Sequence, residues 1–142
     1  MRLNRLTMII FSIALSHSVS AAETVSRDYD FLQMKRGAQL FRQHCAVCHG
    51  HNAEGAANWQ QRDKHGKFPA PALNGSAHAW HHPTKVLIDV IQNGTLRNGG
   101  NMPPWQDKLT EVQIRDIIAW LQSMWSDEVY SAWYRIEKGT GK

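Results

Sequence analysis

The stretch QHCAVCHGH, residues 43–51, contains both cysteines of this 142-residue chain, and a histidine directly follows the second one. Three common uses of a close cysteine pair do not account for that histidine: a redox dithiol in a βαβ unit, half of a zinc site, and a plain disulfide. The first needs strands, and the second needs another cysteine pair, which the chain lacks. The stretch therefore predicts a different kind of site.

Residues Cys45-Ala46-Val47-Cys48-His49 form the pattern C-x-x-C-H, which is typical of covalent haem attachment. Two thiols one helical turn apart can add to the two vinyl groups of one porphyrin, while the next residue turns its imidazole to the iron. The sequence thus predicts one covalent haem c held by Cys45 and Cys48, with His49 as an iron ligand.

Helical patterns flank this motif on both sides. An apolar face at helical spacing precedes the motif and ends close to Cys45. A second pattern runs from about residue 83 to residue 92 and stops at Asn-Gly. The third runs from about residue 111 to residue 124, where Thr110 and Gln113 can form a capping box. No stretch alternates apolar and polar residues as a half-buried strand does, so we expect an all-α chain.

The loops between these helices are long for a compact domain. Residues 50–82 contain no strong periodic element, although connections longer than about 15 residues are uncommon. A large apolar cofactor would supply the missing core surface, which agrees with the haem that the motif predicts.

The first residues read as a secretory signal. Arg2 and Arg5 precede an apolar run of ten residues, and small residues follow it up to Ala22. We therefore expect a cleavable signal peptide at residues 1–22, a single domain at 23–142 and a periplasmic location. The alternative is an uncleaved N-terminal segment that anchors the protein to the membrane.

The charge balance gives no reason to expect nucleic acid as a partner. The chain has 16 Lys and Arg against 12 Asp and Glu, and removal of Arg2 and Arg5 with the signal leaves a net charge of +2. Nucleic-acid binding usually needs basic residues gathered on one face, and no such cluster stands out here.

The chain resembles class I c-type cytochromes, the monohaem cytochrome c family, from residue 36 to residue 125. The stretch RGAQLFRQHCAVCHG resembles the family's first helix, in which a glycine and an aromatic residue, here Gly37 and Phe41, meet the last helix. IIAWLQ places Trp120 where the family has its aromatic contact. The resemblance implies a small cytochrome c fold, with three to five helices and long loops wrapped around one covalently bound haem.

The stretch NGGNMPPWQDKLT offers Met102 as the sixth iron ligand. In the family, the axial methionine is commonly followed by a proline and then an aromatic residue, as Pro103 and Trp105 follow here. The alternatives are the three imidazoles of AHAWHH, since histidine ligation is also a common haem arrangement; they are His78, His81 and His82.

The segment PAPALNG, residues 69–75, supplies two further haem contacts by the same resemblance. A proline in the family offers its carbonyl to the second ring nitrogen of the histidine ligand, and Pro71 matches best, with Pro69 as the alternative. Leu73 would pack against the porphyrin, although a core leucine describes it equally well.

Histidine and methionine ligation occupies both axial positions and raises the reduction potential. We therefore expect a non-enzymatic electron carrier that cycles between Fe(III) and Fe(II) with redox proteins, including a transient association with a membrane-bound oxidoreductase. Two alternatives stay open. One is a haem enzyme or gas sensor with a dissociable methionine, and the other is an obligate cytochrome subunit of a dehydrogenase or oxidase.

After Trp125 the chain continues beyond the resemblance. Val129, Trp133 and Ile136 share one helical face, so a helical extension is expected at about residues 126–137. The simpler expectation is that it packs on the body of the domain; the alternative is a helix that docks a partner.

Overall fold

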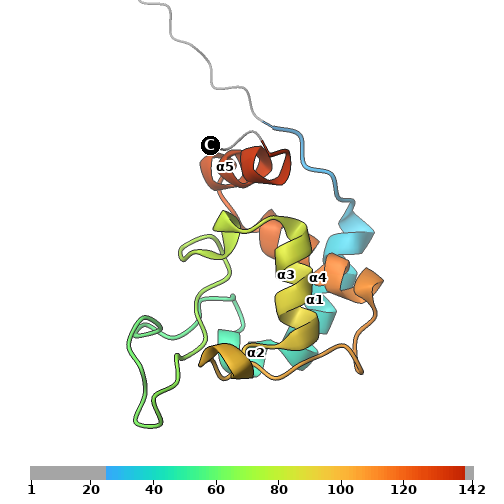
Figure 1. Cartoon of the computed structure of the whole chain (residues 1–142). Coiled ribbons are helices and arrows are strands. Elements are labelled where there is room, and N and C mark those ends of the chain that lie inside the picture. Colours follow the sequence, from blue (N-terminus) through green and yellow to red (C-terminus); the bar gives the residue numbers. More distant parts are fainter. Residues whose placement is uncertain (1–24, 140–142) are drawn as a thin grey trace, which may run out of the picture.

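Five α-helices make up the architecture of the chain, in a computed structural model that describes residues 25–139 (Figure 1). They are α1 (Phe31–His44), α2 (Ala46–His49), α3 (Thr84–Asn93), α4 (Glu111–Ser123) and α5 (Asp127–Glu137), with short 3-10 turns at Ala79–His81 and Leu96–Asn98. Within the described residues there is no strand, only an isolated bridge between Phe68 and Gly100. The all-α prediction is confirmed.

Local side-chain chemistry sets where these helices begin. Asp30 accepts a hydrogen bond from the Gln33 amide at the start of α1. The predicted capping box of Thr110 and Gln113 is present at the start of α4. The third helix matches its prediction to one residue, whereas α3 begins at Thr84, one residue later than expected, because Pro83 is its N-cap.

The first and fourth helices meet at Gly37. A Cβ atom at this position would overlap the backbone carbonyl of Asp116, so only a glycine lets the two backbones approach this closely. One turn further on, the rings of Phe41 and Trp120 lie 4.6 Å apart between centroids. This is the contact that the sequence predicted.

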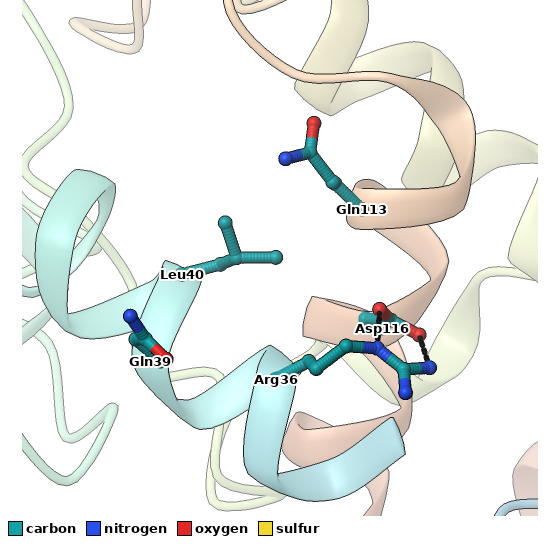
Figure 2. A pocket seen from close by; sticks show the side chains of 5 residues that line it. All are labelled: Arg36, Gln39, Leu40, Gln113 and Asp116. Atoms are coloured by element: carbon teal, nitrogen blue, oxygen red, sulfur yellow. Dashed lines mark hydrogen bonds and ion pairs between the residues drawn. The ribbon is translucent and has the colours of Figure 1, made fainter. Parts of the chain in front are cut away.

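An ion pair closes the same crossing from its outer side. The Arg36 guanidinium donates two hydrogen bonds to the Asp116 carboxylate, at 2.7 and 3.1 Å (Figure 2). The side chain of Asp116 is only 5% exposed, whereas that of Arg36 is 56% exposed. The arginine therefore neutralises a carboxylate that the helix crossing buries.

Two apolar clusters form the core. The larger lies between α1, α3 and α4 and includes Phe41, Ile88, Ile114 and Ile117. The smaller lies under α5 and consists of Ala79, Trp125, Tyr130 and Trp133, with Val25 and Tyr29 of the N-terminal segment against it. The extension beyond residue 125 thus packs on the body of the molecule, as the simpler expectation had it.

Arg27 ties the N-terminal segment to this second cluster. Its guanidinium donates to the backbone carbonyls of Gln122 and Trp125 at 2.6 and 2.8 Å, and to the Asp127 carboxylate at 2.7 Å. It also lies over the Tyr130 ring, 4.6 Å from the centroid. The segment before α1 and the segment after α4 therefore fold against each other.

The long region between α2 and α3 is irregular, as predicted, except for the 3-10 turn at Ala79–His81. No helix within residues 25–139 is long and apolar enough to cross a membrane. The expected signal peptide at residues 1–22 lies outside the described residues.

Candidate haem-binding site

The C-x-x-C-H motif forms the short helix α2, which follows α1 without a loop. The Cys45 amide donates to the Phe41 carbonyl as the C-cap of α1, and the Cys45 carbonyl accepts from the His49 amide one turn later. Both thiols are free; Cys45 is half-buried and Cys48 is exposed. Val47 between them is 90% exposed, so this face of α2 is open to solvent.

The environment of Cys45 does not suit a reactive dithiol. Burial, assisted by the neighbouring Cys48, raises the pKa of the Cys45 thiol to about 11. Redox-active cysteine pairs instead have a lowered pKa, because the thiolate is the reactive form. Cys45 therefore lacks the lowered thiol pKa that is typical of a redox dithiol.

The imidazole of His49 is held from one side by a carbonyl. His49 is only 8% exposed, and its Nδ1 lies 2.9 Å from the carbonyl oxygen of Pro71. Because a carbonyl can only accept, Nδ1 must carry the ring proton, which leaves a lone pair on Nε2. Burial lowers the pKa of His49, and the Pro71 carbonyl opposes this only in part. A neutral imidazole with a free Nε2 is the form that binds a metal.

Met102 lies in the loop between α3 and α4, and Thr95 holds its backbone at two points. The Thr95 amide donates to the Met102 carbonyl at 2.9 Å, and the Met102 amide donates to the Thr95 hydroxyl at 3.2 Å. Gly94, with φ of +68°, lies directly against the backbone of residues 102–104. Met102 as a residue is half-buried.

Leu73 lies where the two apolar clusters meet and packs against both. Its carbonyl accepts a hydrogen bond from the Trp125 indole at 2.9 Å. The leucine is partly buried against the core, and it follows the carbonyl that faces His49 by only two positions.

The three alternative histidines surround the 3-10 turn before α3. His78 stacks on Trp59 with 4.9 Å between ring centroids, and its Nδ1 is buried without a hydrogen-bond partner. His81 packs against Trp80, and His82 lies 5.7 Å from His78 between ring centroids. Each of these rings has aromatic neighbours of its own.

Sequence reasoning missed two residues that shape this site. Thr95 is an ordinary loop threonine by sequence, and its bonds to Met102 span seven residues of irregular chain. Gly94 was interpreted only as the stop signal of a helix. The Asn-Gly pair that precedes the loop methionine was the one sequence signal for the contact between Gly94 and the backbone of residues 102–104.

The donor set fits a c-type haem. Such a haem is bound by two thiols one turn apart, a neutral imidazole with a free Nε2, and a thioether. Here the thioether belongs to a loop whose backbone is held by hydrogen bonds. Within residues 25–139, no group of three or more His, Cys, Asp and Glu side chains gathers to hold a metal ion by itself.

Comparison with known proteins gives a family. The family model described as cytochrome C oxidase, cbb3-type, subunit III matches residues 32–121. The cbb3-type oxidase subunit FixP of a Bradyrhizobium species is 28% identical over 88 residues, which cover 62% of this chain and 26% of that protein. The subunit CcoP of Rhodobacter capsulatus is 28% identical over 102 residues, or 67% of this chain and 30% of its own length.

Two further relatives are named for another cytochrome. Cytochrome c-L of Methylorubrum extorquens is 30% identical over 95 residues, covering 66% of this chain and 41% of that protein. The crystal structure of cytochrome CL from Methylophaga aminisulfidivorans superposes with a TM-score of 0.52 at 26% identity, covering 78% of this chain and 69% of that one. The chain thus spans less than half the length of the three curated relatives compared.

Proposed function

The chain belongs to the family of cytochrome c oxidase, cbb3-type, subunit III, and on that premise we propose that it binds one haem covalently through Cys45 and Cys48, with His49 and Met102 as iron ligands. It is an electron-transfer cytochrome c domain rather than an enzyme. When bound, the haem supplies one-electron cycling between Fe(III) and Fe(II).

The contact between His49 and Pro71 is the observation that carries this proposal. It fixes the proton on Nδ1 and turns Nε2 away from the carbonyl, as a histidine that binds a metal requires. Each cysteine would hold the haem by adding its S–H bond across a vinyl group, which forms a thioether with no net oxidation. The helical turn between Cys45 and Cys48 sets the spacing of those two bonds.

The hydrogen bonds that hold the backbone of Met102 favour electron transfer over binding of an external ligand at the iron. Thr95 bonds the Met102 amide and carbonyl, and two prolines follow this residue, so the backbone that carries the sulfur has little freedom to move. A carrier benefits from a ligand that stays in place in both oxidation states. A gas sensor or haem enzyme would need it to dissociate.

We place the site of action outside the cytoplasm and the partners among membrane-bound oxidoreductases. Both parts rest on the predicted signal peptide and on relatives named as subunits of cbb3-type oxidases. The exposed face of α2 around Val47 would be the surface that faces such a partner. The chain works there as a carrier or as one cytochrome unit of a larger assembly.

Extraction with acidified organic solvent tests the attachment. The colour should stay on the wild-type polypeptide, and a Cys45→Ser, Cys48→Ser double variant should release it. Replacing two thiols by hydroxyls preserves the size of both side chains, so the variant isolates the thioether bonds. A colourless wild-type polypeptide after extraction would rule the proposal out.

A further inference from the structure

Two loop segments run side by side next to His49. The Ala56 amide donates to the Ala70 carbonyl at 2.8 Å, and the Leu73 amide donates to the Ala53 carbonyl at 2.7 Å. Pro71 lies between these two bonds, so its carbonyl is held by the neighbouring segment and not by a helix. What fixes the segment at residues 53–56 therefore also fixes the carbonyl that faces His49.

Gly55 is the point of closest approach between the two segments. A Cβ atom there would stand 2.6 Å from the Pro71 carbonyl oxygen, and closer still to the Pro71 carbonyl carbon and the Ala72 nitrogen. All of these are backbone atoms that no rotamer change can move. Gly55 also has φ of +63°, a conformation that favours glycine.

Gly55 is bonded to His49 as well. Its amide donates to the His49 carbonyl at 2.8 Å. The same glycine therefore touches the backbone of the histidine and the carbonyl that accepts from its ring. Ala53, two residues before it, is fully buried with φ of +55°, the one positive φ of a non-glycine residue among residues 25–139. Such strained, buried backbone leaves the segment little room to yield.

We propose that Gly55 is a positioning residue that sets the hydrogen bond between the Pro71 carbonyl and the His49 imidazole, and through that bond the reduction potential of the iron. The inference rests on the proposed function, since it requires His49 to be an iron ligand.

The direction of the effect follows from the chemistry of imidazole. A carbonyl that accepts from Nδ1 makes Nε2 a better electron donor, and a better donor favours Fe(III). A side chain at Gly55 would displace the Pro71 carbonyl from its present position, 2.9 Å from Nδ1, and so weaken this bond. The imidazole then becomes a poorer donor, so the potential rises.

The experiment compares Gly55→Ala with Gly66→Ala in the haem-loaded protein. Gly66 lies in the same long loop with φ of +72°, and nothing lies within 4 Å of the Cβ that alanine would add. Both variants therefore carry the same backbone strain, but only one has the contact. We measure the reduction potential by voltammetry and the Nδ1 proton of His49 by NMR.

At a fixed electrode potential near the midpoint, Gly55→Ala should raise the ratio of Fe(II) to Fe(III) severalfold, where about tenfold corresponds to 59 mV for one electron. The Nδ1 proton of His49 should shift and exchange faster with solvent. Gly66→Ala should leave both readouts at the wild-type value. If Gly55→Ala lowers only stability, as we expect Gly66→Ala to do, and leaves both readouts unchanged, the inference is overturned.

A milder variant covers the case in which Gly55→Ala does not fold. Ala53→Gly relaxes the strained residue next to the contact, so it should speed exchange of the Nδ1 proton and raise the potential by a smaller factor. Wild-type exchange rates in that variant would overturn the inference. The proposed function fails separately, if the wild-type protein itself shows no covalent haem or no histidine ligation.

Discussion

The two proposed iron ligands are held in opposite ways. The imidazole of His49 is fixed through its own ring, by the Pro71 carbonyl. Met102 is fixed through its backbone, by Thr95, and its thioether makes no hydrogen bond in the described structure. The Met102 side chain can therefore be exchanged without disturbing the bonds that hold the loop, which makes it the better residue to mutate.

Met102→Leu should open one axial position of the iron. Leucine keeps most of the apolar volume but has no sulfur, and loss of a thioether, which favours Fe(II), lowers the reduction potential. The variant should bind added imidazole, which visible spectroscopy detects, and its midpoint potential should fall.

Met34→Leu is the matched control, because Met34 lies on α1 and is not a proposed ligand. This variant should keep the spectrum and the reduction potential of the wild type. A wild-type spectrum for Met102→Leu would transfer the role of sixth ligand to one of three histidines, His78, His81 and His82.

His78 should make stability depend on pH. Burial, together with the neighbouring His82 and His81, lowers the pKa of His78 in the folded protein below its ordinary value of 6.5. As the pH falls below about 6.5, the unfolded chain takes up a proton before the folded one does, so stability falls with it. His78→Phe keeps a ring against Trp59 and removes a buried nitrogen without a partner. Urea denaturation between pH 7 and pH 5 should then show a weaker loss of stability than in the wild type.

His65→Phe provides the comparison, since His65 is exposed in the loop. Equal slopes for the wild type and His78→Phe would show that His78 titrates alike in both states.

At the scale of elements, the crossing of α1 and α4 should be the part of the fold least tolerant of added volume. An exposed glycine in a helix is normally improved by alanine by about 1 kcal/mol. At Gly37 the sign should reverse, because the added Cβ meets the backbone of Asp116. We expect Gly37→Ala to lower the free energy of unfolding by about 1–3 kcal/mol.

Urea denaturation of Gly37→Ala measures this loss, and the pair Lys35→Ala and Lys35→Gly on the exposed side of α1 measures the helix propensity alone. A Gly37→Ala variant as stable as the wild type would mean that the two backbones are not in contact.

The helices could be predicted from sequence because their signals are local. Caps such as Thr110 with Gln113, and the stop after Asn93, involve residues three or four positions apart. The Gly37 contact was within reach only through the family resemblance. The contacts that hold the loops were not, because the Ala53 carbonyl and the Leu73 amide are 20 residues apart with no periodic pattern between them.

For the same reason the sequence predicted the motif at Cys45–His49, and the resemblance implied the contact of the Pro71 carbonyl with His49, but neither indicated which residues hold Pro71 in place. The pattern specifies which groups attach, whereas the placement of Gly55 against Pro71 depends on how two irregular segments pack. The ion pair of Arg36 with the buried Asp116 was also missed, since two charges 80 residues apart have no shared signal.

At the scale of the whole molecule, one region of the structure matches the family, and two segments, one before it and one after it, lie outside the match. The match covers residues 32–121, so both Arg27 and α5 lie outside it. These flanking parts hold each other through the second apolar cluster and through the hydrogen bonds of Arg27. They therefore form a unit that should loosen without disturbing the haem site.

Arg27→Ala should lower stability by about 2 kcal/mol, since hydrogen bonds to charged groups contribute about 1.5–3 kcal/mol each and this arginine is partly exposed. The amides of α5 should exchange hydrogen faster, while the haem spectrum stays unchanged. Hydrogen exchange read residue by residue measures both.

Arg27→Lys should fall between the wild type and Arg27→Ala, because lysine keeps the charge but lacks the planar fork. Wild-type protection of α5 in Arg27→Ala would show that the aromatic cluster alone holds the helix.

The pairing of Arg27 with α5 also determines where the two ends of the described chain lie relative to the haem-attachment helix. The segment before α1 and the end of α5 lie at the same end of the molecule, while α2 lies at the opposite end (Figure 1). Neighbouring ends are what allow a domain to be inserted within a longer polypeptide or circularly permuted. A linker joined next to either of these segments would leave the attachment helix α2, with its exposed Val47, at the far end of the molecule and accessible to a partner.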